Sequence, residues 1–235
     1  MSKIVTNVVL NAKMSDLIVS YPNTITVLER LNIPFGFGEK KVEKIAGDHQ
    51  LDVQAFLSIL QVFAEKFENS IILNRDAVWD VLKFLKASHL YFKEKQIPDI
   101  KQLIGLFSET IPPKYGTMIV SFFDEYVYEV NEHFLYEDEI VFPYIDSALN
   151  HSSFLSFEIE KFEKNHTDIE QKLLDLKHIL IKYVPEKTCS SCRAQILRQL
   201  NALEEDLYYH TQIEDSLLVP SIKKIEKENR KTKKP

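Results

Sequence analysis

The segment Asn131–Tyr144, NEHFLYEDEIVFPY, decides how this sequence is interpreted. It has the pattern of a buried helix, yet it carries His133 and Glu137 four residues apart on its apolar side. Because an α-helix advances about 100° per residue, a step of four returns to nearly the same face, roughly 6 Å further along. A buried carboxylate is costly unless its charge is compensated. A bound cation is the simplest compensation, so the segment predicts a pair of metal ligands on a core helix.

The composition predicts an all-α protein and excludes several classes of partner. The 235 residues are 45% hydrophobic and include only 5 glycines and 9 prolines, with helical periodicity between them. The net charge of -6 argues against a nucleic-acid binder, and the basic end KKIEKENRKTKKP, which lacks aromatics, is expected to be a solvated tail. Because the chain has neither a signal peptide nor an apolar run of about 18 residues, a cytoplasmic protein without a membrane partner is expected.

Breaks in the helical pattern divide the chain into a small N-terminal domain and a larger one. Around the turn NIPFGFGEKK, the N-terminal part is expected to hold three helices, near Met14–Leu31 (with Pro22 inside), Lys41–Ile45 and Asp52–Phe67. Four long amphipathic segments follow: Ala77–Glu94, Lys114–Ala148, Ser153–Tyr183 and Ser191–Lys227. The first connection has room for a short helix, DIKQLIGLF. Long helices joined by short or moderate loops predict an up-down four-helix bundle.

These patterns give four predicted regions. They are a small helical N-terminal domain (1–70), a linker (71–76), a four-helix bundle (77–228) and a basic disordered tail (229–235).

The other three predicted bundle helices also place a histidine on their apolar face. The fourth repeats the opening pattern with His210 and Glu214, the third contributes His166 and the first His89. Each chain interval from one histidine to the next spans one helix reversal, which suits a common level in the bundle. The candidate metal ligands are therefore His89, His133, Glu137, His166, His210 and Glu214.

Four imidazoles and two carboxylates suit two first-row metal ions, with each carboxylate able to bridge them. Zinc tolerates these ligands, but its structural sites are usually four-coordinate and closed. Six protein ligands leave open positions on two octahedral ions, which favours iron. The alternative is a set of ordinary hydrogen-bonded histidines in a metal-free helical interaction module.

Several neighbouring side chains are further candidates for a role at the site. Glu170, four residues after His166, is expected to face water or to hydrogen-bond a ligand, with direct ligation as the alternative. His178 is a weaker alternative ligand, and Asp215 is rotated off the ligand face. Tyrosine hydroxyls could donate hydrogen bonds to the ligands, although core or surface roles are the simpler interpretation. These tyrosines are Tyr126, Tyr208 and Tyr209.

Two stretches resemble a known signature. HFLYEDEIVFPYI is similar to the His-x-x-x-Glu-Glu-x-x-x-Phe-Pro pattern of hemerythrin-like (HHE) domains, and HTQIEDSLLVP resembles its second copy. The spacing of the six candidates looks most like the repair-of-iron-centres family, di-iron proteins associated with nitrosative and oxidative stress. The resemblance implies two non-haem iron ions, bridged by Glu137 and Glu214 and by an oxo or hydroxo group when oxidised. It also implies a small N-terminal helical domain.

The cysteines depart from that family. It usually shows Ile-Asp-Phe-Cys-Cys-Gly in the first turn, where this chain has IPFGFG with Gly36 and Phe37 in the cysteine positions. The chain's two cysteines, Cys189 and Cys192, lie in TCSSC and are expected to be thiols in a reducing cytosol. An incidental loop pair is the simpler interpretation, and a redox or auxiliary iron role is the alternative.

Within the resemblance, the first hypothesis is a cytoplasmic di-iron protein that protects or repairs iron centres, such as iron-sulfur clusters, under nitric oxide or oxidative stress. Its small ligands would be O2 or NO, and its acceptors iron-sulfur proteins. The rivals are an O2 or NO sensor or carrier, and a di-iron NO reductase or peroxidase, so the sequence does not decide whether the protein is an enzyme. Nor does it decide the oligomeric state, for which a homodimer is one option.

Overall fold

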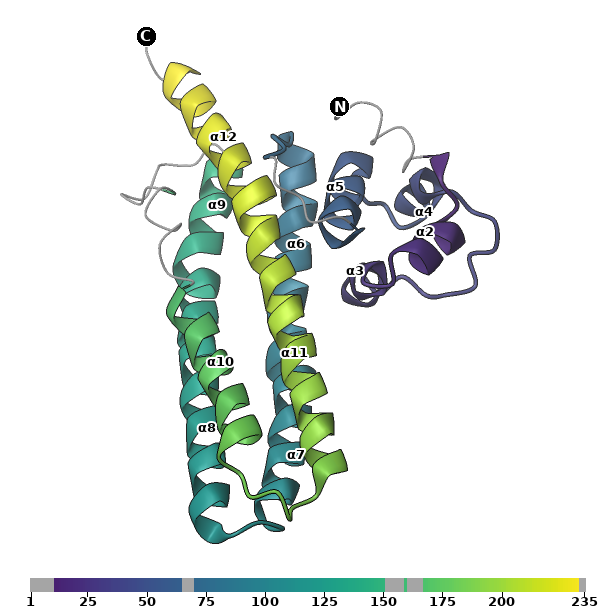
Figure 1. Ribbon diagram of the computed structural model, residues 1–235. Coiled ribbons are helices and arrows are strands. Elements are labelled where there is room, and N and C mark those ends of the chain that lie inside the picture. Colours follow the sequence, from purple (N-terminus) through teal and green to yellow (C-terminus); the bar gives the residue numbers. More distant parts are fainter. Residues whose placement is uncertain (1–10, 65–69, 151–158, 160–166, 233–235) are drawn as a thin grey trace. The chain divides into compact units, whose positions relative to one another are not determined.

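The computed structural model describes residues 11–64, 70–150, 159 and 167–232 (Figure 1). Regular structure in these residues is helical, apart from one isolated antiparallel bridge between Lys13 and Lys41. The prediction of an all-α protein is therefore confirmed. Of the described helices, none combines the length and the apolarity that a membrane crossing requires.

Internal contacts divide the chain into two compact units. Unit 1 comprises the described parts of Met1–Ser88, Phe142–Glu160 and Tyr209–Pro235, and unit 2 those of His89–Val141 and Lys161–Tyr208. The predicted division into residues 1–70, 71–76, 77–228 and 229–235 stays a prediction.

Unit 1 begins with four short helices: α2 (Met14–Ser20), α3 (Thr24–Arg30), α4 (Val42–Asp48) and α5 (Val53–Ala64). The single helix predicted over residues 14–31 is wrong, because Pro22 divides it. A proline disfavours helical geometry in the residue before it, and Tyr21 has φ -135° and ψ 79°. Asp52 starts α5 as its N-cap, since its Oδ1 accepts the backbone N–H of Ala55 at 3.0 Å.

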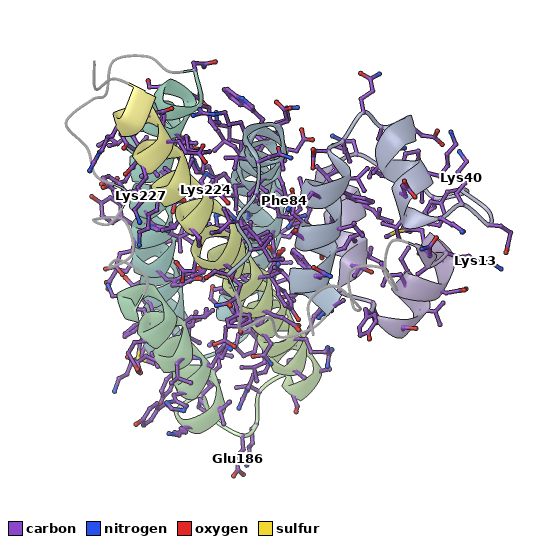
Figure 2. All side chains as sticks on the ribbon, turned by 90° about the horizontal axis from the view of Figure 1, so that it is seen from above. Lys13, Lys40, Phe84, Glu186, Lys224 and Lys227 are labelled. Carbon is purple, nitrogen blue, oxygen red and sulfur yellow. A yellow bond between two sulfur atoms is a disulfide. The ribbon has the colours of Figure 1, made fainter. Side chains whose placement is uncertain are left out.

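The predicted glycine turn between α3 and α4 is confirmed. Gly36 has φ +97° and Gly38 has φ +58°, backbone conformations that glycine adopts without steric cost. Figure 2 labels Lys40, near the end of this turn, and Lys13, which directly precedes α2. Lys40, just before α4, donates to Asp48 at the end of α4 at 2.8 Å, and this ion pair is exposed.

Three of the four long predicted segments continue through a π-helical turn. Their elements are α6 (Arg75–Tyr91), η1 (Phe92–Gln96), α7 (Ile97–Ser108), α8 (Pro113–Tyr136), η2 (Glu137–Val141), α9 (Phe142–Leu149), α10 (Thr167–Lys182), α11 (Ser190–Ile213), η4 (Glu214–Leu218) and α12 (Val219–Thr232). The predicted end of the first segment at Glu94 is wrong, because the chain passes from η1 directly into α7. The predicted start of the third segment, residues 153–166, lies outside the described residues except for 159.

Within unit 2, four helices pack around one apolar core. Side chains from α7, α8, α10 and α11 share this core, among them Ile100, Phe123, Leu173 and Leu200. Each is at most 1% exposed. Figure 1 shows α10 beside α8, in agreement with their direct contacts, and Figure 2 labels Glu186 in the turn between α10 and α11.

The C-terminal helix α12 packs against α9 in unit 1. Asn229 on α12 is buried, donates to the carbonyl of Ala148 at 2.9 Å and accepts a bond from Arg75 at 2.5 Å. Figure 2 labels Lys224 and Lys227 on the same helix. The basic tail predicted from residue 229 is therefore helical as far as Thr232. The prediction of a solvated tail rested on the basic run without aromatics, whereas buried hydrogen bonds of Asn229 hold this end of the helix in place.

The residues expected to link the domains are bound to the C-terminal part of unit 1. The backbone N–H of Ile71 donates to the carbonyl of Ser216 at 2.9 Å, and that of Leu73 donates to Oγ of Ser221 at 2.8 Å. Leu73 is 1% exposed.

The expectation of free thiols is wrong, because Cys189 and Cys192 form a disulfide with a Cα–Cα distance of 5.3 Å. The turn that leads into α11 brings the two sulfurs together. The separation of three residues between the two cysteines did not by itself indicate this turn.

Candidate metal centre

The buried carboxylate of Glu137 faces two imidazoles within unit 2. Its Oε2 lies 2.9 Å from Nε2 of His89, and its Oε1 lies 3.0 Å from Nε2 of His133. Glu137 has no exposed surface and begins η2, one turn after His133 on the continuous helix. Each carboxylate oxygen therefore faces a different histidine, which is the arrangement that a carboxylate bridging two ions needs.

The donor set of this cluster fits metal ions. Nδ1 of His89 lies 2.8 Å from Oδ1 of Asp138, and a carboxylate accepts, so Nδ1–H donates. A neutral imidazole has one N–H, which leaves the Nε2 lone pair directed at Glu137. Two ligand atoms that are each about 2.1 Å from one ion, at a right angle, lie about 3 Å apart. A cation would turn these opposed lone pairs into ligands.

Asp138 holds His89 in place, a role that sequence reasoning did not assign. Besides accepting from His89, it accepts from Nζ of Lys93 at 2.8 Å. Partial burial alone would raise the pKa of Asp138, but the hydrogen bonds from His89 and Lys93 outweigh it and bring this pKa below its ordinary value. Phe134 stacks on the His89 ring, with centroids 4.2 Å apart. The ring is thus fixed by one hydrogen bond and one aromatic face.

A sequence signal for Asp138 was present. The dipeptide Glu-Asp follows each His-x-x-x motif, as Glu137-Asp138 and as Glu214-Asp215. A carboxylate next to a ligand is a common partner for the outer nitrogen of a ligating histidine.

The second copy of the motif lies in unit 1. His210 is near the end of α11 and Glu214 begins η4, with Nε2 of His210 3.2 Å from Oε1 of Glu214. The two side chains are 3% and 0% exposed. This buried pair has the same one-turn spacing as His133 and Glu137.

Each of the two carboxylates begins a π-helical turn that ends just before a helix with proline in its second position. Pro143 and Pro220 are six residues after Glu137 and Glu214. A proline cannot donate to the carbonyl four residues earlier, and its ring clashes with that carbonyl. The wider π turn removes the clash without ending the helix. Each buried glutamate is the first residue of such a turn.

The predicted ligand set stays a prediction. The structure brings His89, His133 and Glu137 together within unit 2, and His210 and Glu214 together within unit 1. His166 lies outside the described residues, so its predicted role stays a prediction. For Glu170, the structure describes the backbone in α10 but not the side chain.

The tyrosines have other surroundings. Tyr126 is buried in the core of unit 2, where burial raises the pKa of its hydroxyl. Tyr209 stacks on Phe63 with centroids 4.6 Å apart and accepts a hydrogen bond from Asn23, so it contacts the N-terminal helices. Tyr208 is 37% exposed. The simpler interpretation of these side chains, as core or surface residues, agrees with these positions.

Comparison with known proteins agrees with this geometry. Residues 80–222 match the family model of the hemerythrin HHE cation binding domain. A probable iron-sulfur cluster repair protein of Haemophilus influenzae is 21% identical over 220 residues, covering 89% of this chain and 96% of that protein. The iron-sulfur cluster repair protein YtfE of an Enterobacter species is 20% identical over 221 residues, covering 88% of this chain and 94% of that protein.

The family match includes both His-x-x-x-Glu motifs and more than half of the chain. It confirms the predicted hemerythrin-like four-helix architecture and implies iron binding. The protein belongs to the hemerythrin HHE cation-binding family.

Proposed function

We propose that this protein is a cytoplasmic non-haem di-iron protein that protects or repairs iron-sulfur clusters under nitric oxide or oxidative stress. The repair activity is taken from the names of the relatives, which match this chain along most of its length. The di-iron centre rests on the residues of this chain.

The observation that carries the proposal is the position of Glu137. Its two oxygens face Nε2 atoms of two different histidines, at 2.9 and 3.0 Å. One carboxylate that served a single ion would not need an imidazole on each oxygen. The second motif supplies His210 and Glu214, and the repeat in the sequence supplies His166 as the sixth ligand.

The protein's own residues would bind and orient the pair of ions. Asp138 keeps the proton of His89 on Nδ1, so Nε2, which faces Glu137, is the nitrogen that would ligate an ion. Burial of Glu137 and Glu214 excludes water from the carboxylates. When bound, iron would supply the binding of O2 or NO and, when reduced, could be taken up by an acceptor. Four neutral imidazoles and only two carboxylates would leave excess positive charge on a reduced centre, which would favour release of iron.

Iron transfer to an apo iron-sulfur protein tests the proposal. The reduced, iron-loaded protein is mixed anaerobically with an apo ferredoxin, sulfide and thiol, and cluster absorbance is followed. We expect clusters to form with wild-type protein and with Glu139→Gln, an exposed residue in the same π turn. Glu137→Gln should fail.

Other outcomes of these measurements would support one of the alternative functions. NO or peroxide consumption that continues with an electron donor, without iron transfer, would replace repair by a reductase or peroxidase activity. Reversible binding of O2 or NO without either process would indicate a sensor or carrier. Equal transfer by wild-type and Glu137→Gln protein would contradict the proposed centre.

A further inference from the structure

The Cys189–Cys192 bridge lies at the turn before α11, in unit 2. Both residues are partly exposed and also contact the apolar core of the unit. Both residues therefore keep some exposed surface while they pack against the core.

A structural role explains this bridge poorly. It joins residues that are three apart in the sequence, within the turn that begins one helix. It does not connect two helices. Closing so short a loop restricts the unfolded chain much less than a long-range bridge does.

The backbone around Cys189 favours a thiolate on this residue. The N–H of Cys192 donates to Sγ of Cys189 at 3.3 Å, and the hydroxyl of Ser191 lies 3.4 Å from the same sulfur. Cys189 immediately precedes α11, a helix of 24 residues, so its sulfur occupies the N-cap position and accepts one of the otherwise unpaired N–H groups. Both contacts stabilise negative charge on Cys189 when the bridge is open.

Arg193 fixes the turn that carries the pair. Its backbone N–H donates to the carbonyl of Cys189 at 3.1 Å, and its guanidinium donates to the carbonyl of Pro185 at 2.8 Å and to the Thr188 hydroxyl. These bonds keep the turn in place whether or not the two sulfurs are joined. The pair can therefore open and close without unfolding the start of α11.

We propose that Cys189 and Cys192 form a thiol–disulfide exchange site that is separate in function from the metal centre. In the reduced protein, the Cys189 thiolate attacks a partner disulfide, forms a mixed disulfide and releases one partner thiol. Cys192 loses its proton and attacks Sγ of Cys189, which releases the second thiol and restores the bridge. Two electrons pass to the partner disulfide, and a dithiol donor reverses the process. The partner class is a disulfide or dithiol, and glutathione serves as the probe.

Trapping of the mixed disulfide tests the inference in the full-length protein. Reduced Cys192→Ser and Cys189→Ser are each incubated with oxidised glutathione, and intact mass is followed over time. We expect Cys192→Ser to acquire one glutathione at least about tenfold faster than Cys189→Ser, because only Cys189 accepts the helix N–H. The double variant Cys189→Ser/Cys192→Ser controls for adducts elsewhere, and circular dichroism checks folding.

The wild-type protein gives a second, independent measurement. Equilibration with mixtures of reduced and oxidised glutathione, followed by alkylation, should show a reversible two-electron transition with little change in melting temperature. Equal adduct rates in the two single variants would overturn the inference. So would a bridge that resists reduction until the protein unfolds. Both measurements apply equally to metal-free protein, so failure of the di-iron proposal would not alter them.

Discussion

The chain contains the sequence His-x-x-x-Glu-Asp twice, once at 133–138 and again 77 residues later at 210–215. In both copies the glutamate is buried, begins a π-helical turn and precedes a proline by six residues. The aspartates differ. Asp138 is about one-third exposed and hydrogen-bonds His89 and Lys93, whereas Asp215 is exposed.

This difference distinguishes features that one helix determines by itself from features that need residues elsewhere in the chain. The ligand pair and the π turn follow from residues within one helix, so both copies have them. Support of an additional histidine depends on residues elsewhere in the chain. His166 follows His89 by the same 77 residues, which predicts that it corresponds to His89 in the second copy.

Loss of either buried carboxylate should have the largest effect. We expect Glu137→Gln and Glu214→Gln each to reduce iron content at least about tenfold, because an amide neither carries the charge nor bridges two ions well. Iron per chain is measured by mass spectrometry after anaerobic loading. Glu139→Gln should retain wild-type iron, and unequal losses in the two glutamate variants would show that the copies are not equivalent.

The aspartates provide a sharper comparison. Asp138→Asn should weaken iron binding about 10- to 100-fold, because the His89 ring loses the acceptor that fixes its proton. Titration with Fe(II) against a chelator gives the affinity. Lys93→Met leaves the Asp138–His89 bond intact and should have a smaller effect. If Asp215→Asn weakens iron binding as much as Asp138→Asn does, Asp215 supports a histidine in the second copy as Asp138 supports His89. If Asp215→Asn leaves iron binding unchanged, the predicted correspondence between His166 and His89 is wrong.

The prolines test whether the π turns serve the carboxylates. Pro143→Ala and Pro220→Ala restore an N–H and should allow a tighter helix, raising the free energy of unfolding by about 1 kcal/mol. Iron binding should weaken severalfold, because the glutamate direction changes. Pro98→Ala, after the π turn η1 that begins with Phe92, should change stability but not iron binding. Urea unfolding of metal-free protein gives the stability, and unchanged iron binding in all three variants would contradict this role.

Substitutions of two glycines test whether the stability of the helices can change without a change in metal binding. A Cβ on Gly116 in α8 would lie 2.7 Å from the carbonyl oxygen of Ser108, whereas nothing lies within 4 Å of a Cβ on Gly105 in α7. Gly116→Ala should lower stability by about 1–3 kcal/mol, and Gly105→Ala should raise it by up to about 1 kcal/mol. Thermal unfolding measures both. The two changes should leave the number of bound irons unaltered, so a loss of iron in Gly105→Ala would argue against this separation.

The sequence predicted the helical class and the ligand pairs because both depend on local periodicity. The pairs His133–Glu137 and His210–Glu214 are one helical turn apart, and the structure brings each pair to about 3 Å. The helix break at Pro22 was missed, although the effect of proline on the preceding Tyr21 is local. Here the apolar periodicity continued across the break and masked it.

Features that depend on distant residues were not accessible. The contact between Asp138 and His89 joins residues 49 apart, and the bond of Asn229 to Ala148 joins residues 81 apart. Side-chain periodicity carries no information on such pairs. The prediction for Cys189 and Cys192 was wrong for another reason. The expectation of thiols came from an assumed compartment and not from the turn itself.

Mössbauer spectroscopy of iron-57-loaded, air-oxidised protein, together with iron per chain, tests the central claim most directly. A carboxylate-bridged pair predicts two irons per chain that are magnetically coupled to a diamagnetic ground state, and loss of this signal in Glu137→Gln. A single uncoupled ferric ion, or a coupled pair that survives in Glu137→Gln, would contradict the account.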